Sequence, residues 1–364
     1  MTAEVREAFR ELFGEGLARK GLPLHPVRVE VVIDKAPTAV ANALRRALYG
    51  ETQGRCLTFD DESFSQKEVT DPFMQDYDYV RTRLRHVHLR PQVSESLVKS
   101  LRFALRRKNE TDRVLTLYSG DLTLEKGGGP APSAPLFNPT VELAFLQPGR
   151  SISISGIYIK EGFGSADSAF YNTCRATAIP LDLAELPRGD THAFGGPAAE
   201  QSGYAQSSLV ANPRRHRVAA TICAAPAQDY ETSARIILRD ACTSVIQRLQ
   251  FVVTVINGAK KDGEYVASAA DKFLVTQEAE GWKGVLSVQK ETMTVARLIE
   301  RAVYETTPQV AFVGATCIDH EQSMELQVRH AGADPEELKK ILLNAVNYAR
   351  EAFTNIRKGI TVAA

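Results

Sequence analysis

VANALRRALYGE, residues 40–51, predicts an amphipathic helix, because its apolar side chains recur at the spacing of one helix face. Those side chains are Val40, Leu44, Ala47 and Leu48. Thr38 stands where a hydroxyl can cap the first turn, and Gly50 stands where a glycine can end a helix. We therefore expect this helix to bury one face and to present the other.

A second stretch, VARLIERAVYE at residues 295–305, repeats the first. The identical pairs are Val40/Val295, Ala41/Ala296, Arg46/Arg301, Ala47/Ala302 and Tyr49/Tyr304. Leu44 and Leu48 are matched by the similar residues Ile299 and Val303. Only the first copy carries Asn42, Arg45 and Arg46 together on its polar side. The repeat predicts two related halves, one of which is modified for an additional role.

The order of patterns along the chain predicts an α+β fold. Each half reads as a strand, the repeated helix, further strands and a closing helix. Two such sheet-plus-helix dimerisation units can bury their apolar faces against each other, which predicts a pseudo-dimer within one chain. Its expected core residues are Val40, Leu44, Leu48, Val295, Ile299 and Val303.

The predicted domains follow from the same patterns. An N-terminal helix occupies residues 1–23, with helical spacing over 4–20. The first dimerisation unit is discontinuous, with parts at residues 24–59 and 216–257, and a β-rich insert domain at 60–215 interrupts it. A linker at 258–263 leads to the second unit at 264–364.

Several local patterns predict particular elements. Residues 97–105 are typical of a strand, and residues 160–164, KEGFG, of a tight glycine loop. A one-step slip in the alternation at Ser155 and Gly156 predicts a β-bulge. Long helices are predicted over residues 232–255 and from Asp334 to about residue 357.

The composition narrows the classes of function. Lysine plus arginine and aspartate plus glutamate both number 44, and this balance argues against broad phosphate-driven nucleic-acid binding. The five cysteines form no C-x-x-C pair, which disfavours a zinc knuckle and suggests reduced thiols in an intracellular setting. The charged N-terminus is unlike a signal peptide, and no stretch has the apolar length of a membrane span.

Several motifs carry a resemblance to a known family. Residues 42–48, NALRRAL, resemble the N-A-L-R-R-[IAV]-L signature of the alpha-like subunits of multisubunit RNA polymerases. Residues 78–89 and 145–164 resemble two further segments of that family, and residues 291–294, ETMT, stand where its smaller partner subunit has E-D-H-T. In this order, the motifs resemble a fusion of the third-largest and eleventh subunit types, as in large DNA viruses of the asfarvirus type.

The resemblance implies a non-catalytic assembly scaffold of a DNA-directed RNA polymerase. The first half would dock the second-largest subunit and the second half the largest, with small adaptor subunits at the edges. We expect no cofactor or metal, since the cysteine cluster that binds zinc in some members of that family is absent from this sequence. We also expect no membrane partner, and contact with DNA or RNA only through the complex. The expected location is the host cytoplasm, in a viral factory, and the virion.

The resemblance also assigns subunit-interface residues, namely Asn42, Arg45, Arg46, Gly162 and Gly164. Two guanidinium groups and an amide suit bidentate bonds to the carboxylates or carbonyls of a partner. The glycines would allow close approach of another backbone. We expect no catalytic residue in this chain.

Two other functions compete with the scaffold. A stand-alone nucleic-acid-binding transcription factor would use the basic runs at residues 81–90 and 214–217. A metal-dependent enzyme would use Asp76 and Asp78, but a single D-x-D pair is a weak signal. The alternative without a functional role is that Arg45 and Arg46 simply belong to a solvated helix face.

Overall fold

The fold is α+β, with mixed helices and antiparallel sheets. The computed structural model describes residues 3–7, 27–61, 77–89, 95–126, 136–137, 139–164, 166–171, 173–181, 215–222, 230–261, 264–266, 268, 270–279, 281–318, 323–331 and 334–360. None of the helices within these ranges is long and apolar enough to cross a bilayer.

The first sheet has four antiparallel strands in the order β1-β2-β10-β9. They are β1 (Ala3–Glu7), β2 (Val27–Ile33), β10 (His216–Ile222) and β9 (Thr173–Pro180). Two helical segments lie with this sheet in one core. They are α2 (Thr38–Arg46), which continues as the π-helical turn η1 (Ala47–Glu51), and α6 (Tyr230–Ile256).

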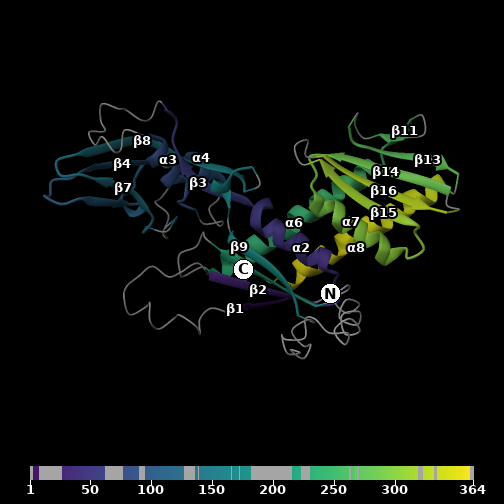
Figure 1. The fold of residues 1–364 in the computed structure, drawn as a ribbon. Coiled ribbons are helices and arrows are strands. Elements are labelled where there is room, and N and C mark those ends of the chain that lie inside the picture. The colour runs from purple at the N-terminus through teal and green to yellow at the C-terminus, as the bar shows by residue number, and fades with distance from the viewer. Residues whose placement is uncertain are drawn as a thin grey trace, which may run out of the picture.

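The second sheet has six antiparallel strands in the order β11-β12-β13-β14-β16-β15. They are β11 (Ala259–Lys261), β12 (Glu264–Val266), β13 (Lys272–Glu278), β14 (Gly281–Gln289), β16 (Ser323–His330) and β15 (Phe312–Ile318). Its helices are α7 (Met293–Thr306) and α8 (Pro335–Gly359). In Figure 1 the helices α2, α6, α7 and α8 gather between this sheet and the rest of the molecule.

A β-rich region with its own core follows α2 along the chain. Its four-stranded sheet consists of β3 (Gln53–Thr58), β8 (Ser151–Phe163), β4 (Arg102–Lys108) and β6 (Thr123–Lys126). A two-stranded sheet is formed by β5 (Leu115–Tyr118) and β7 (Glu142–Leu146). The short helices are α3 (Tyr77–Arg85), α4 (Glu95–Ser100), η4 (Ser119–Asp121) and η5 (Ser168–Phe170).

One continuous apolar core contains side chains from both repeated helices. It also includes residues of β2, α6, β14, β16 and α8. The six core residues expected from the sequence all lie in it, each at most 1% exposed: Val40, Leu44, Leu48, Val295, Ile299 and Val303. Burial of large aliphatic side chains stabilises a fold by about 1.5–3 kcal/mol each, so this helix contact is a major part of the core.

Several predicted elements are confirmed. The long helices predicted near residues 232–255 and 334–357 are α6 and α8. The Asp334 side chain caps α8 by accepting a hydrogen bond from the Glu337 amide at 2.7 Å. The bulge also lies where predicted, because Phe103 pairs with Ile157 and Leu105 with Ile154, which leaves one β4 residue opposite Ser155 and Gly156.

Other predictions were wrong at the ends of elements. Residues 3–7 form strand β1 instead of helix, because they add an edge strand to β2, and the rest of the predicted N-terminal helix lies outside the described residues. Thr38 does not cap α2, since Pro37 is the N-cap residue and the Thr38 hydroxyl lies 3.1 Å from Nε2 of His216. The helical backbone also passes through Gly50 and ends at Glu51.

The structure corrects three more local predictions. Residues 259–261, in the predicted linker, form β11 and pair with β12. The predicted strand over 97–105 begins as helix α4 and becomes strand only at Arg102. Residues 160–163 of KEGFG continue β8 because β3 offers a paired edge, with Gln53 opposite Phe163. Thus β3 pairs within the β-rich region, and β9 pairs within the first sheet.

Candidate interaction surface

The outer side of α2 carries the polar group that the sequence singles out. Asn42 and Arg46 are exposed and Arg45 is half-buried. None of these three side chains makes a hydrogen bond or ion pair with any other residue that the structure describes. We call Asn42, Arg45 and Arg46 the arginine face. Its two cations are therefore available for carboxylates from outside the described chain.

The equivalent side of α7 is neutralised within the helix. Arg297, which aligns with Asn42, forms an ion pair with Glu300 at 2.7 Å. Arg301, which aligns with Arg46, forms an ion pair with Glu305 at 2.7 Å. In α2 the positions of Glu300 and Glu305 are held by Arg45 and Gly50, so the intrahelical partners are absent. The arginines of α7 are thus neutralised by glutamates of the same helix, whereas those of α2 have no carboxylate partner among the described residues.

The aligned tyrosines, Tyr49 of the π turn and Tyr304 of α7, also differ in their partners. The Tyr304 hydroxyl donates to the Val313 carbonyl at 3.2 Å and accepts from the Val313 amide at 3.3 Å, which ties it to β15. Tyr49 instead stacks on Tyr171, with ring centroids 4.6 Å apart and an interplanar angle of 31°. Tyr49 is 41% exposed, so part of its ring remains accessible beside the arginine face.

Gly162 and Gly164 have a reason for being glycine within this chain. A Cβ on Gly162 would lie 2.5 Å from the Phe170 ring, and one on Gly164 would overlap the Tyr171 ring. Gly54, directly opposite Gly162 on β3, would overlap the backbone of Phe170. The three glycines form a cradle for residues 166–171. A role of Gly162 and Gly164 in contacting another subunit stays a prediction.

A half-buried arginine joins the two repeated helices. Arg248 on α6 forms an ion pair with Glu51 at the end of η1. It also donates hydrogen bonds to Oε2 of Glu291 at 2.6 Å and 2.9 Å, to Oε1 of Glu291 at 3.2 Å, and to the Thr292 hydroxyl at 2.8 Å. Glu291 is 4% exposed, and Thr292 is the N-cap residue of α7. Burial alone would lower the pKa of Arg248. The hydrogen bonds and charges of Glu291 and Glu51 outweigh this effect, and the net result is a pKa above the ordinary value of arginine.

The π-helical end of α2 is satisfied by the first sheet. The last carbonyls of a helix lack partners within it, and the Leu48 carbonyl accepts a hydrogen bond from the Thr173 hydroxyl at 2.9 Å. Both groups are buried. This bond fixes the turn from which Glu51 meets Arg248, so β9 helps to hold the junction of the two helices.

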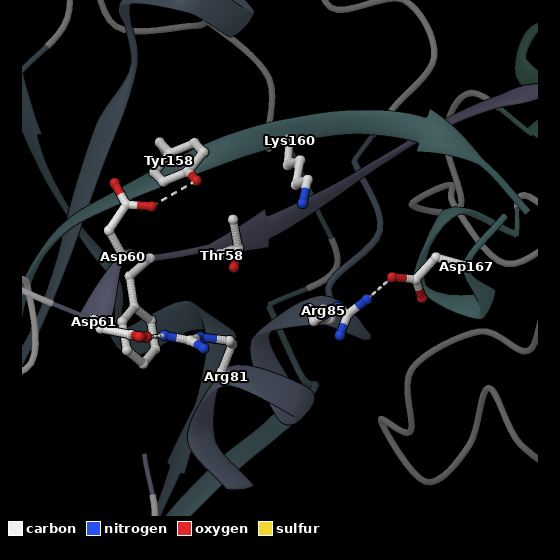
Figure 2. A pocket seen from close by; sticks show the side chains of 9 residues that line it. Thr58, Asp60, Asp61, Arg81, Arg85, Tyr158, Lys160 and Asp167 are labelled. Atoms are coloured by element: carbon white, nitrogen blue, oxygen red, sulfur yellow. Dashed lines mark hydrogen bonds and ion pairs between the residues drawn. The ribbon is translucent and has the colours of Figure 1, made fainter. Parts of the chain in front are cut away.

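The first basic run contacts its own chain. Its residues line a depression of about 680 Å³. There Arg81 pairs with Asp61, Arg85 pairs with Asp167, and Lys160 lies nearby (Figure 2). The Tyr158 hydroxyl donates to Asp60 across the same depression at 2.9 Å. Its lining thus has equal numbers of basic and acidic side chains.

The other arginines of the basic runs that the structure describes also have partners. Arg83 donates to the Glu142 carbonyl at 3.0 Å, and Arg215 forms an ion pair with Asp34 at 2.9 Å. Arg217 lies 3.9 Å from Glu30. Burial, with a smaller effect of His86, lowers the pKa of His88 to about 4, which leaves that ring neutral at physiological pH. These contacts favour a structural role for both runs over nucleic-acid binding.

The proposed metal pair finds no support among the described residues. Asp78 is exposed and lies 3.5 Å from Arg81, while Asp76 is outside the described ranges. Within those ranges no group of three or more His, Cys, Asp or Glu side chains is placed to hold a metal ion.

Sequence reasoning missed Arg248, Asp167 and Tyr171. Arg248 interrupts the apolar side of the α6 pattern, between Val245 and Val252, and a lone charge in an apolar stripe is the signal that could have identified it. Asp167 and Tyr171 carry no such signal, because only the folded β8 segment brings them to α3 and Tyr49.

Comparison with known proteins gives a consistent set of relatives. The chain is 30% identical over 356 residues to proteins named DNA-directed RNA polymerase RPB3-11 homolog from a Malawi tick isolate, a Kenyan pig isolate and the Vero-adapted Badajoz strain of African swine fever virus. Each match spans 98% of this chain and 93% of the relative. No family model matches the chain.

Proposed function

The chain belongs to the family of viral DNA-directed RNA polymerase subunits that are RPB3-11 homologs, and we propose that it is the assembly scaffold of such a polymerase. Its arginine face docks the second-largest subunit, and its second half docks the largest. Small adaptor subunits cover remaining edges, and DNA and RNA are contacted only through the assembled enzyme. The complex acts in viral factories of the host cytoplasm and is packaged in the virion.

The observation that carries the docking proposal is the contrast between α2 and α7. Nearly the same helix appears twice, and only the copy with NALRR leaves its guanidinium groups without carboxylates among the described residues. A guanidinium that is desolvated at an interface needs a hydrogen-bonded carboxylate or carbonyl. The second-largest subunit would supply those acceptors, in a geometry that suits bidentate bonds.

Intramolecular pairing is the second part of the proposal. Two related sheet-plus-helix units form a pseudo-dimer, and the β-rich region is an insert in the first unit. Supporting observations are the contact of α2 with α7, the contact of α6 with α8, and the bonds from Arg248 to both repeats. A fused chain removes most of the entropic cost of bringing two partners together, which gives the larger subunits a preformed base.

The docking proposal is tested with paired double variants of the full chain. Arg45→Ala with Arg46→Ala should reduce capture of the second-largest subunit by at least about 100-fold, because truncating interfacial charge pairs costs about 2–5 kcal/mol each. The matched control is Arg297→Ala with Arg301→Ala on α7, which should capture it normally. Both proteins are compared by co-purification from cells expressing the polymerase subunits. Normal capture by the Arg45/Arg46 variant would refute the role of this face.

A further inference from the structure

We propose that Tyr49 and Tyr171 form an aromatic shelf that extends the arginine face and receives an apolar side chain from an acidic segment of the docked subunit. This inference rests on the proposed function and specifies the chemistry of the partner. The segment would carry carboxylates for Arg45 and Arg46 and an aromatic or aliphatic residue about one turn away.

The shelf lies on the same side of the helix as the cations. Tyr49 follows Arg45 by four positions and Arg46 by three, and it lies in the π-helical turn that continues α2, so these side chains occupy successive turns of one helical surface. The Tyr49 ring is 41% exposed and rests against Tyr171. Tyrosine and arginine are among the residues enriched at the positions that dominate binding energy in protein interfaces, so their proximity favours a protein partner.

The repeated helix provides an internal reference for the shelf. Tyr304 has nearly the same exposure, at 40%, but its hydroxyl is bonded to both backbone groups of Val313. The arginines beside it are neutralised by Glu300 and Glu305. Only the α2 copy therefore combines an accessible aromatic ring with cations that lack partners in the described chain.

Residues 166–171 are held so that Tyr171 is ready for binding. Asp167 forms an ion pair with Arg85 of α3 and accepts a hydrogen bond from the Ala169 amide at 3.0 Å. Phe170 is 5% exposed and lies against Gly54 and Gly162. These contacts order the segment before a partner arrives, and preorganisation lowers the entropic cost of association. The β-rich region thus contributes directly to a surface centred on α2.

The charges favour an acidic segment with an apolar residue over other occupants. A purely apolar segment would bury Arg45 and Arg46 without acceptors, which is unfavourable. A nucleic-acid strand could stack a base on tyrosine, but two cations and a balanced overall charge offer little of the electrostatic attraction on which such binding depends.

The test measures affinity for the purified second-largest subunit at two salt concentrations, using the full chain. Tyr171→Ala should weaken binding about tenfold, by loss of an aromatic contact, with little change in the salt dependence. Tyr171→Phe should bind as the parent does. Tyr304→Phe is the control on α7 and should also bind normally. Gly54→Ala keeps both tyrosines but displaces Phe170, and it should weaken binding to a similar extent.

Unaltered affinity in Tyr171→Ala, with wild-type circular dichroism and urea unfolding, would overturn the shelf. If the Arg45/Arg46 variant still loses binding in that case, the docking face stands and only the shelf fails. If neither variant loses binding, the proposed function fails as well. A fluorescent single-stranded oligonucleotide that binds the parent chain and not Tyr171→Ala would overturn the choice of a protein partner.

Discussion

Helices α2 and α7 are nearly the same on their buried sides and different on their outer sides. Val40, Leu44 and Leu48 of one enter the same core as the matching residues of the other. Outside, α7 pairs each arginine with a glutamate, whereas α2 presents Arg45 and Arg46 uncompensated among the described residues. The comparison shows that a duplicated element can keep its packing and change its surface by substitution at a few polar positions.

The two helices also meet Arg248 through different ends. The C-terminal π turn of α2 offers Glu51, and the N-terminal cap of α7 offers Glu291 and Thr292. One cation on α6 therefore bonds to both copies at their junction. The buried Glu291 carboxylate needs a paired cation, and Arg248 supplies it while also holding Glu51, so this junction depends on all three ionic groups.

The largest effect is expected when the ion pair of α7 is introduced at the equivalent positions of α2, which removes the difference between the two helices. Asn42→Arg with Arg45→Glu recreates the Arg297–Glu300 pattern and removes the net positive charge added by Arg45. We expect capture of the second-largest subunit to fall by about 1,000-fold or more, because like charges at an interface cost several kcal/mol. Affinity measured by surface plasmon resonance checks this, and urea unfolding should show unchanged stability. Binding within tenfold of the parent would contradict it.

Removing Arg248 tests whether the two helices depend on their shared cation. Arg248→Met should lower the free energy of unfolding by about 3 kcal/mol, since it leaves the buried Glu291 and the half-buried Glu51 without their partner. Adding Glu51→Gln and Glu291→Gln to the same protein should restore most of the loss. Urea denaturation of the single and triple variants measures both effects. Equal stability of the single variant and the parent would show that the bridge is not structurally important.

Acid should destabilise the β-rich region more than it destabilises the second sheet and its helices. The pKa of His88 is lowered from 6.5 to about 4 by burial, so the unfolded chain binds a proton more readily between these values. Stability from this group is present above pH 6.5 and is lost as pH falls towards 4, by about 2 kcal/mol after allowance for residual exposure. Hydrogen exchange at pH 4.5 should show earlier opening around β3 and α3 than in α7, and His88→Gln should reduce the difference.

The smallest effect is expected from the surface pairs of α7. Arg297→Ala or Arg301→Ala should change the free energy of unfolding by about 0.5 kcal/mol or less, because ion pairs three or four residues apart on a helix surface contribute little. The Arg45→Ala variant of α2 should be equally stable. Thermal unfolding at low and high salt compares them. A loss above about 1.5 kcal/mol on α7 would mean that its charges hold the fold and that α7 is an unsuitable control.

The α+β class, the four helices of the shared core and the bulge in β8 could be predicted from residue patterns. The repeated apolar spacing identified α2 and α7, the long periodic runs identified α6 and α8, and the slip at Ser155 and Gly156 identified the bulge. Each of these signals is local, since it depends on side chains within a few turns of one another. Residues 3–7 were misassigned because their strand exists only through pairing with β2.

The arginine face was also identifiable in the sequence, because NALRR places a polar group on a helix whose other side is apolar. What the sequence could not provide was the partner of each charge. That Arg85 meets Asp167, or that Arg248 meets Glu51 and Glu291, depends on residues brought together from distant parts of the chain.

Local periodicity and the internal repeat were thus sufficient to establish helices α2, α6, α7 and α8, the α+β class and the residues that enter the shared core. The long-range fold was needed to assign Gly162 and Gly164 to the Phe170 and Tyr171 rings, to place Tyr171 beside Tyr49, and to show which arginines are already paired. The physical reason is that apolar burial follows the spacing of neighbouring residues, whereas hydrogen bonds, ion pairs and ring contacts require specific atoms to meet within a few ångströms.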